Sequence, residues 1–255
     1  MDMTNADISC LQEEMDKGRL NAKDLTIAYL KRIQQYDQSG PEINSVAELN
    51  PDAVFIAEAL DRERAISGPR GPLHGIPVLL KDNISTGDKM HTTAGSVALS
   101  DNFARKDASL VEQLRKAGAV ILGKTNLSEF ARYIAIEFPD GYSSRCGQVK
   151  NPYDSSFPVS GSSSGSAAAV AGRFCSAAVG TETAGSITFP AIFSGICGMK
   201  PTVGLISRSG ILPICGQDTA GPMAATVTDC AVLLGGMVTG PDSDDPATGC
   251  TGHLV

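Results

Sequence analysis

The sequence is poor in the residues that bind metals or form disulfide frameworks. It has only three histidines among 255 residues, His74, His91 and His253, and none lies in an HExxH or other paired-ligand spacing. Its seven cysteines are an odd, scattered set without a CxxC pair, which disfavours both a disulfide scaffold and a structural zinc site. Any hydrolytic chemistry is therefore expected to need no metal and no other cofactor. The cysteines are Cys10, Cys146, Cys175, Cys197, Cys215, Cys230 and Cys250.

Positive charge and long apolar runs are also scarce. The 21 Lys and Arg residues are outnumbered by 28 Asp and Glu, which gives a net charge of -7 and opposes a general role in binding nucleic acid. Apolar-rich stretches such as Ala167–Ala171 are far shorter than the ~20 residues that cross a bilayer. The first ten residues are polar and acidic, unlike a secretory signal. We therefore expect a cytoplasmic protein with neither a nucleic acid nor a membrane as partner.

The hydrophobic content of 42% is enough for a substantial core, and the first third of the chain has mostly helical patterns. Apolar residues at helical spacing between Ile8 and Tyr36 predict two helices broken near Gly18, with Asn21 as an N-cap. A short strand over Ser45–Leu49 and a helix over Pro51–Ile66 are predicted next.

Strand and helix patterns then alternate, which predicts an α/β fold. The predicted order of strand, helix and strand implies a right-handed parallel crossover. We expect a mixed central β-sheet with helices on both faces. The predicted elements are a strand over Ile76–Leu80, a helix over Ser109–Lys116, a strand over Ala119–Leu122, a helix over Ser166–Gly172, a strand over Ser176–Gly180 and short strands around Gly204–Leu212.

Three polar segments adjoin the predicted buried strands: Leu79–Asn83, Ser160–Ser166 and Gly180–Ser186. Alone, each has an ordinary explanation as a solvated charge, a flexible linker or a tight connection. The serine-rich run, however, leads directly into an alanine-rich helix, and a helix entry presents free N–H groups. A glycine at 185 lets the next turn direct several N–H groups at one oxygen, which predicts an oxyanion hole beside Ser186.

Together these segments resemble the amidase signature family, and in detail its bacterial amidase and peptide-amidase-like branch. The resemblance extends from about Ser45 to about Gly240. Beyond the two serine-containing segments, it rests on four ordered motifs, Gly75–Asn83, Ile121–Glu129, Gly198–Gly204 and Gln217–Met223.

The resemblance implies a Ser-Ser-Lys triad, with Lys81 as base, Ser162 as a proton relay that follows a cis peptide bond, and Ser186 as nucleophile. A serine hydroxyl is a weak nucleophile until a base takes its proton, and lysine can be that base only if burial keeps its amine neutral. The implied reaction releases ammonia or an amine and a carboxylate through an acyl-enzyme.

Other residues have lesser predicted roles. The backbone N–H groups of Thr183, Ala184, Gly185 and Ser186 are expected to form the oxyanion hole. Ser163 and Thr181 are expected either to support the hydroxyl network or to make structural hydrogen bonds at a turn. His74 is interpreted as structural, and Asp218 as a residue near the site without a catalytic role.

The resemblance also implies that the chain corresponds to the N-terminal half to two-thirds of a typical member, so that the fold is C-terminally incomplete. We expect a single domain over residues 1–255, with a mostly helical segment 1–66, a signature core 67–240 and a polar tail 241–255. An open sheet edge would favour a homo-oligomer or association with a missing C-terminal half.

Two rival functions stay open. One is an inactive fragment or binding remnant of an amidase, against which the intact Lys81, Ser162 and Ser186 argue. The other is an amidotransferase A-like subunit that works with partner proteins on a charged tRNA, although Gln217–Pro222 is more similar to stand-alone amidases. The substrate is expected to be a small-molecule or peptide amide.

Overall fold

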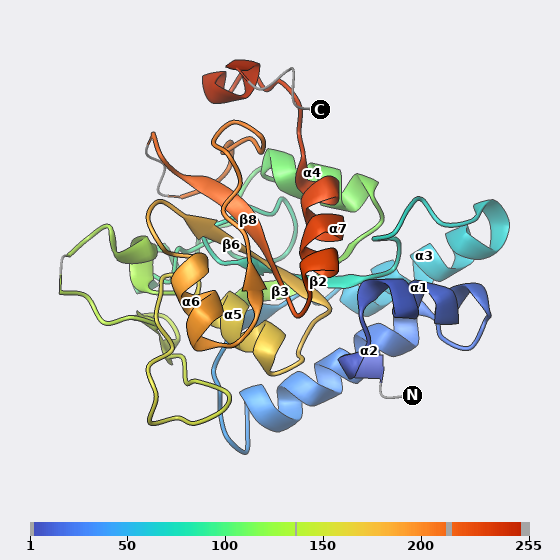
Figure 1. Cartoon of the computed structure of the whole chain (residues 1–255), viewed down its shortest axis with the longest axis horizontal. Coiled ribbons are helices and arrows are strands. Elements are labelled where there is room, and N and C mark those ends of the chain that lie inside the picture. The colour runs from blue at the N-terminus through green and yellow to red at the C-terminus, as the bar shows by residue number, and fades with distance from the viewer. Residues whose placement is uncertain (1–2, 136, 213–215, 251–255) are drawn as a thin grey trace.

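A six-stranded mixed β-sheet forms the centre of the computed structural model, which describes residues 3–135, 137–212 and 216–250 (Figure 1). The strand order is β1-β3-β2-β6-β8-β7. The central strands β3, β2 and β6 are parallel, whereas β1, β8 and β7 run antiparallel to their neighbours. The strands are β1 (Val46–Leu49), β2 (Pro77–Lys81), β3 (Val120–Thr125), β6 (Ala177–Glu182), β7 (Cys197–Gly198) and β8 (Thr219–Ala224).

The middle of the sheet is completely buried, and its strands begin with apolar runs and end in polar residues. Every residue of β2, β3 and β6 is buried, as expected for parallel strands covered on both faces. The helix α4 (Ser109–Lys116) connects β2 to the parallel strand β3, which confirms the predicted helix between two parallel strands. The predicted α/β class with a helix-flanked mixed sheet is confirmed.

The N-terminal segment folds largely as predicted. The helices α1 (Ile8–Asp16) and α2 (Ala22–Arg32) are separated at Gly18, whose φ of 66° suits glycine. The Asn21 side chain caps α2 by accepting a hydrogen bond from the Asp24 N–H at 2.6 Å. A π-helical turn (Ile33–Asp37) extends α2, and α3 (Ala53–Ser67) packs against both α2 and β3.

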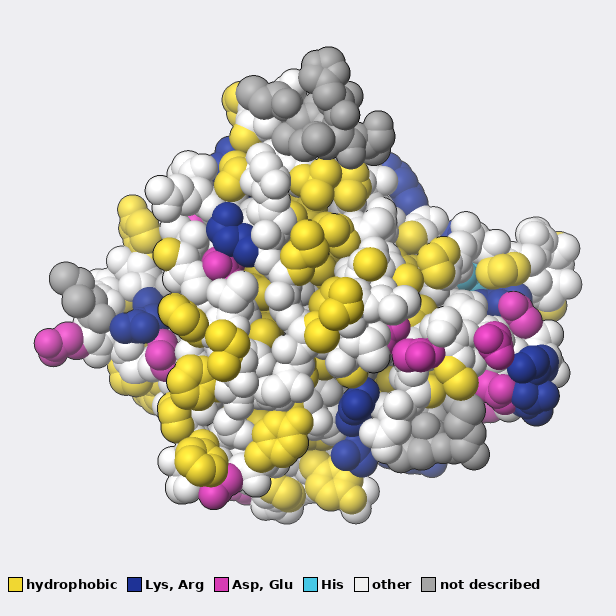
Figure 2. All heavy atoms as spheres, in the orientation of Figure 1, with side chains coloured by type: hydrophobic (Ala, Val, Ile, Leu, Met, Phe, Trp, Pro, Cys, Tyr) yellow, Lys and Arg dark blue, Asp and Glu magenta, His cyan; other side chains and the backbone are white. Residues whose placement is uncertain are grey.

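The remaining helices cover the sheet. The helix α5 (Ser164–Ala171) packs on β6, and α7 (Val227–Met237) packs on β8 and α4. Hydrophobic side chains gather over α6 (Thr188–Phe193) and α7 on the face seen in Figure 2, where Phe189, Ile192 and Val227 are exposed. Shorter elements are the hairpin β4 (Tyr142–Ser143) and β5 (Gly147–Gln148) and the 3₁₀ turns Met3–Asn5, Val97–Leu99, Glu129–Arg132 and Pro246–Cys250.

The prediction of short strands around Gly204–Leu212 is wrong. That segment consists of turns, and its one β-bridge joins Ile211 to Ile84. Glycines with positive φ at 204 and 210 bend the chain there, and Ile206 and Ile211 are buried below the turns without joining the sheet. The strand that completes this side of the sheet is instead β8.

The predicted N-terminal segment and signature core share one sheet, since β1 pairs with β3 from Val46 to Leu49. The division into segments 1–66, 67–240 and 241–255 remains a prediction. Residues 251–255 of the predicted tail, with His253, and Cys215 lie outside the described residues. Within the described ranges, no helix combines the length and apolar character needed to cross a membrane, and no cluster of His, Cys, Asp or Glu could hold a metal ion.

Candidate active site

The site is built around Lys81, the last residue of β2. Its Nζ lies 2.7 Å from Ser162 Oγ, 2.8 Å from Thr181 Oγ1 and 3.3 Å from the Thr181 carbonyl oxygen. Since β2 lies beside β6 in parallel, the ends of both strands reach the same edge of the sheet, and Lys81 meets a residue 100 positions later in the chain. Both Lys81 and Ser162 have no exposed surface.

Burial dominates the acid–base properties of Lys81. It lowers the pKa of the Lys81 amine to about 7, and the negative charges of Asp218 and Glu182 offset only part of that effect. The amine is therefore largely neutral in mildly alkaline solution. A neutral amine has a lone pair that can accept a proton from a neighbouring hydroxyl.

Ser162 lies in the loop that enters α5, and the peptide bond between Gly161 and Ser162 is cis, as the family resemblance implied. The Ser162 carbonyl oxygen accepts a hydrogen bond from the Ser128 N–H at 3.1 Å. A Cβ on Gly161 would lie 2.4 Å from the Ser128 hydroxyl oxygen, so a side chain there would displace that hydroxyl. The serine loop is thus tied to the segment that follows β3.

Ser186 lies in the turn after β6 and is half-buried. Its carbonyl oxygen accepts a hydrogen bond from the Ser163 N–H at 3.0 Å, which joins the nucleophile candidate's turn to the serine loop. The Ser163 hydroxyl also donates to the Thr181 carbonyl oxygen at 3.1 Å and accepts from the Thr181 N–H at 3.2 Å. Lys81, Ser162, Ser163, Thr181 and Ser186 therefore belong to one connected region.

Glu182, to which sequence analysis gave no role, organises the turn that carries Ser186. Its carboxylate accepts the backbone N–H groups of Gly185 and Ile187 at 2.8 Å and of Thr188 at 2.9 Å. Burial raises the pKa of Glu182, but the backbone donors outweigh it and hold the pKa below its usual value. The only sign of this role in the sequence was an acidic residue in a glycine-containing turn beside a serine.

The four expected oxyanion-hole positions differ in their surroundings. Gly185 has a φ of 90°, which glycine adopts readily, and its N–H is already engaged by Glu182. Thr183 and Ala184 are exposed, and the Thr183 hydroxyl donates to Asp218. The remaining candidates in this turn for binding an oxyanion are therefore the N–H groups of Thr183, Ala184 and Ser186.

Asn83 was part of the sequence motif but had no predicted role. Its Nδ2 donates to Thr181 Oγ1 at 3.0 Å and to the Leu212 carbonyl oxygen at 2.6 Å. A carbonyl oxygen can only accept a hydrogen bond, so the bond to Leu212 fixes which end of the Asn83 amide faces it. Asn83 thereby holds the Thr181 hydroxyl against the Lys81 amine.

A small cavity of about 30 Å³ opens beside Ser186. Its charged lining residues are both acidic, Glu182 and Asp218, and the rest are neutral. A volume of this size holds a group about as large as one or two water molecules. The neutral lining residues are Asn83, Ala131, Tyr133, Thr181, Thr183, Ser186 and Ile211.

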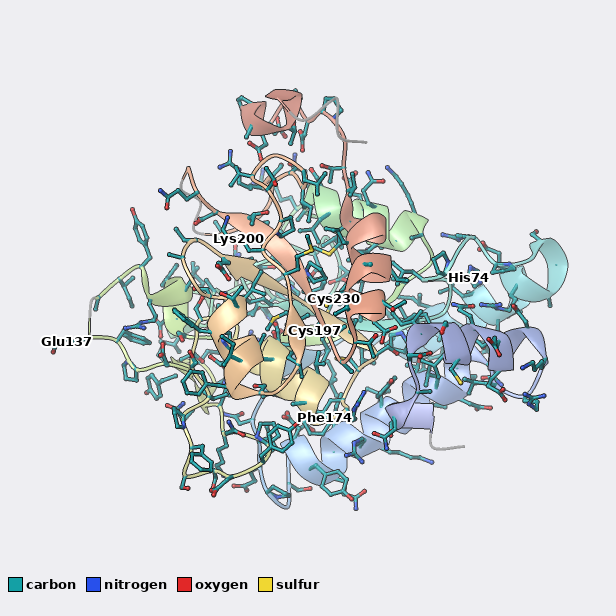
Figure 3. The ribbon with its side chains drawn as sticks, in the orientation of Figure 1. His74, Glu137, Phe174, Cys197, Lys200 and Cys230 are labelled. Atoms are coloured by element: carbon teal, nitrogen blue, oxygen red, sulfur yellow. The ribbon has the colours of Figure 1, made fainter. Side chains whose placement is uncertain are left out.

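His74, labelled in Figure 3, lies in the segment between α3 and β2. Its Nε2 is 2.9 Å from the Leu60 carbonyl oxygen, and its Nδ1 accepts the Arg70 N–H at 3.3 Å. The histidine is buried, and it ties the middle of α3 and the loop after that helix to the segment that leads into β2. Its structural interpretation is confirmed.

A second buried lysine, Lys124, lies on the neighbouring strand β3. Its Nζ donates to the Ile84 carbonyl oxygen at 2.7 Å and to Thr92 Oγ1 at 3.1 Å. Burial lowers the pKa of Lys124 to about 8, against the opposing charge of Asp82. Lys124 thus fixes the loop that follows Lys81, and neither of these hydrogen bonds reaches a serine of the site.

The mixed sheet and the lysine–serine cluster at its strand ends define an amidase-signature type of protein. The family model described as Amidase matches residues 24–251, so the chain belongs to the amidase family. Its structure is similar to the X-ray structure of native peptide amidase from Stenotrophomonas maltophilia, with a TM-score of 0.94 and 52% sequence identity. The match covers 97% of this chain and 50% of the peptide amidase chain.

Two curated relatives add to this comparison. A probable amidase of Arabidopsis thaliana is 47% identical over 98% of this chain and 49% of the relative. A glutamyl-tRNA(Gln) amidotransferase subunit of Halorhodospira halophila is 43% identical over 93% of this chain and 47% of the relative. The chain spans about half the length of these relatives.

Proposed function

We propose that this chain carries the catalytic core of a metal-independent amide hydrolase that uses Lys81, Ser162 and Ser186 as a Ser-Ser-Lys triad. The observation that carries the proposal is the 2.7 Å contact between Lys81 Nζ and Ser162 Oγ, in a fully buried setting where the amine has a pKa of about 7. Lys124 is also buried with a lowered pKa, but its hydrogen bonds go to Ile84 and Thr92, whereas the Lys81 amine contacts a serine hydroxyl.

In the first step, Ser162 takes the proton of the Ser186 hydroxyl and passes its own proton to the Lys81 amine. Ser186 Oγ attacks the amide carbonyl carbon, and negative charge develops on the carbonyl oxygen. The N–H groups of Thr183, Ala184 and Ser186 stabilise that oxyanion, while Glu182 holds Gly185 and the rest of the turn in place.

In the second step, the carbon–nitrogen bond breaks and an acyl group stays on Ser186. The leaving nitrogen receives a proton from Lys81 through Ser162 and departs as neutral ammonia or amine. Water, deprotonated by the same relay, then attacks the acyl-enzyme and releases a carboxylate. Thr181 and Ser163 support the relay through their hydrogen bonds to Lys81 and to the strand end.

The proposed substrate is a linear carboxylic amide of a small molecule or peptide. Identity to the probable amidase of Arabidopsis thaliana, at 47%, exceeds the 43% identity to the amidotransferase relative, which favours a stand-alone amidase over a component of a tRNA-dependent complex. The amidotransferase alternative predicts ammonia release that depends on partner proteins.

Ammonia release from a panel of simple amides tests the proposal. The unmodified chain is expected to release ammonia, and Ser186→Ala and Lys81→Met are each expected to lose at least about a thousandfold in kcat/KM. Ser155→Ala, at an exposed serine outside the site, is the matched control and keeps full activity. Equal activity of Ser186→Ala and the unmodified chain would contradict the proposal.

A further inference from the structure

The amide side chain of Asn83 has one hydrogen-bonding atom that the triad does not explain. Its Nδ2 is fully used, since it donates one hydrogen bond to Thr181 Oγ1 and another to the Leu212 carbonyl oxygen. Its Oδ1 is buried and accepts no hydrogen bond from any residue that the structure describes. A buried oxygen without a donor costs free energy, so this atom is suited to a bound group that brings a donor with it.

Asn83 also lines the cavity of about 30 Å³ beside Ser186. The unused acceptor and the small space are two independent observations at one residue. Together they point to a bound group of about the size of water that has N–H or O–H groups. The other buried side-chain oxygens without a partner in the described part of the chain belong to residues that do not line this cavity, which are Thr26, Thr86, Ser164 and Ser194.

The cavity lies on the same side of Ser186 as the proton relay. Thr181 lines the cavity, and its Oγ1 is 2.8 Å from Lys81 Nζ and 3.0 Å from Asn83 Nδ2. In the proposed mechanism the leaving nitrogen must lie on this side, because it receives its proton from Lys81 through Ser162. The water that attacks the acyl-enzyme must lie there too, since it gives a proton to the same relay.

We propose that Asn83 is a substrate-binding residue whose Oδ1 accepts a hydrogen bond first from the leaving amide nitrogen and then from the attacking water. This inference rests on the proposed amide hydrolase function. The acceptor oxygen disfavours the substrate carbonyl oxygen in the same place, because two acceptors cannot share a hydrogen bond. The small cavity beside Asn83 favours primary amides, whose leaving group is ammonia, over amides with a larger group on the nitrogen.

Methanol separates this hydrogen bond from the proton relay. When water attacks the acyl-enzyme, one O–H proton passes to Ser162 and the second O–H donates to Asn83, whereas methanol has a single O–H, which the relay takes. Each nucleophile forms a bond to the acyl carbon and breaks the bond from that carbon to Ser186 Oγ, which regains its proton from the relay. With butyramide as the substrate, the products are butyrate and methyl butyrate. Their ratio compares the two nucleophiles on one acyl-enzyme, so a change in the basicity of Lys81 affects both alike.

Two variants separate the acceptor from the rest of the Asn83 side chain. Asn83→Leu removes both amide atoms, whereas Asn83→Asp keeps Oδ1 and loses Nδ2, so the second variant is the matched control for the lost hydrogen bonds to Thr181 and Leu212. At pH 8 and equal methanol concentration, the butyrate-to-methyl butyrate ratio is expected to fall roughly tenfold in Asn83→Leu and to stay within about threefold of the original in Asn83→Asp. An unchanged ratio in Asn83→Leu, or an equal fall in both variants, would overturn the inference.

The unmodified chain offers a test that needs no folded variant. Its kcat/KM for butyramide is expected to be roughly tenfold or more above that for N-propylbutyramide, because the propyl group exceeds the cavity. For the same reason, butyramide should protect Ser186 from fluorophosphonate labelling at a concentration roughly tenfold lower than N-propylbutyramide. Equal values for the two amides in either measurement would overturn the inference. Butyramide hydrolysis that survives Ser186→Ala would overturn the proposed function instead.

Discussion

Lys81 Nζ and Ser162 Oγ lie 2.7 Å apart, and neither residue has any surface exposed to solvent. A charged lysine in such a place costs free energy, because the hydrogen bonds of its amine go to Ser162 and Thr181 oxygens of hydroxyl and carbonyl groups, which have no full negative charge. The neutral amine that results is a suitable acceptor for the serine proton. Burial of Lys81 therefore lowers the stability of the fold and, at the same time, keeps the amine neutral so that it can act as a base.

The pH dependence of activity should follow the Lys81 amine. With a pKa of about 7, the amine is protonated and inactive below that value, so kcat/KM should rise from pH 6 to pH 8 with a midpoint near 7. Initial rates of ammonia release across this range measure it. A flat profile, or activity that falls as the pH rises through 7, would exclude the proposed role of Lys81.

The stability of the fold should depend on pH through the same group. The pKa of Lys81 is lower in the folded chain than in the unfolded chain, so the unfolded state binds more protons above pH 7 and stability rises with pH. Lys81→Met lacks this dependence. Its free energy of unfolding minus that of the unmodified chain should therefore be about 2–3 kcal/mol higher at pH 6 than at pH 9, so the substitution is more stabilising at pH 6. Urea denaturation at both values tests this, and an equal difference at both would contradict it.

Glu182 should control the geometry of the nucleophile's turn. Glu182→Gln keeps the size of the side chain but leaves a single acceptor oxygen for the three N–H groups of Gly185, Ile187 and Thr188. We expect kcat to fall by roughly ten- to a hundredfold, with a smaller change in KM, because a misplaced oxyanion hole affects the transition state most. An effect confined to KM would argue against this role.

Close packing at Gly165 should make that position intolerant of any side chain. A Cβ there would lie 2.2 Å from the Asn126 carbonyl oxygen and 2.5 Å from that of Ser45. Gly165→Ala is therefore expected to destabilise the chain by about 3 kcal/mol or more, since backbone atoms must move. Gly71→Ala, where a Cβ meets open space, is the matched control and should change stability by less than about 1 kcal/mol. Thermal unfolding compares the two.

Sequence patterns predicted the elements in which periodicity and side-chain type agree. The α4 bounds, the break at Gly18 and the Asn21 cap were all predicted from local signals. The strand β8 was not predicted, because it contains Gly221 and Pro222, which are unusual inside strands. Gly221 is needed there because a Cβ would lie 2.1 Å from the Met199 carbonyl oxygen, and that contact is invisible in the sequence.

The site was less predictable from sequence patterns than the fold was. The lysine–serine contact joins residues 81 positions apart, and only the resemblance to a family brought them together before the structure was known. The roles inferred for Glu182 and Asn83 depend on hydrogen bonds to particular backbone atoms. Composition and spacing contain no information on such contacts, which arise only when the strand ends meet at one edge of the sheet.

Mass-spectrometric mapping of a fluorophosphonate adduct tests the central claim most directly, because it reports the nucleophile itself. We predict one adduct, on Ser186, whose rate of formation increases from pH 6 to pH 8 and drops at least about a hundredfold in Lys81→Met. An adduct on another residue, or a labelling rate unaffected by Lys81→Met, would contradict the Ser-Ser-Lys assignment.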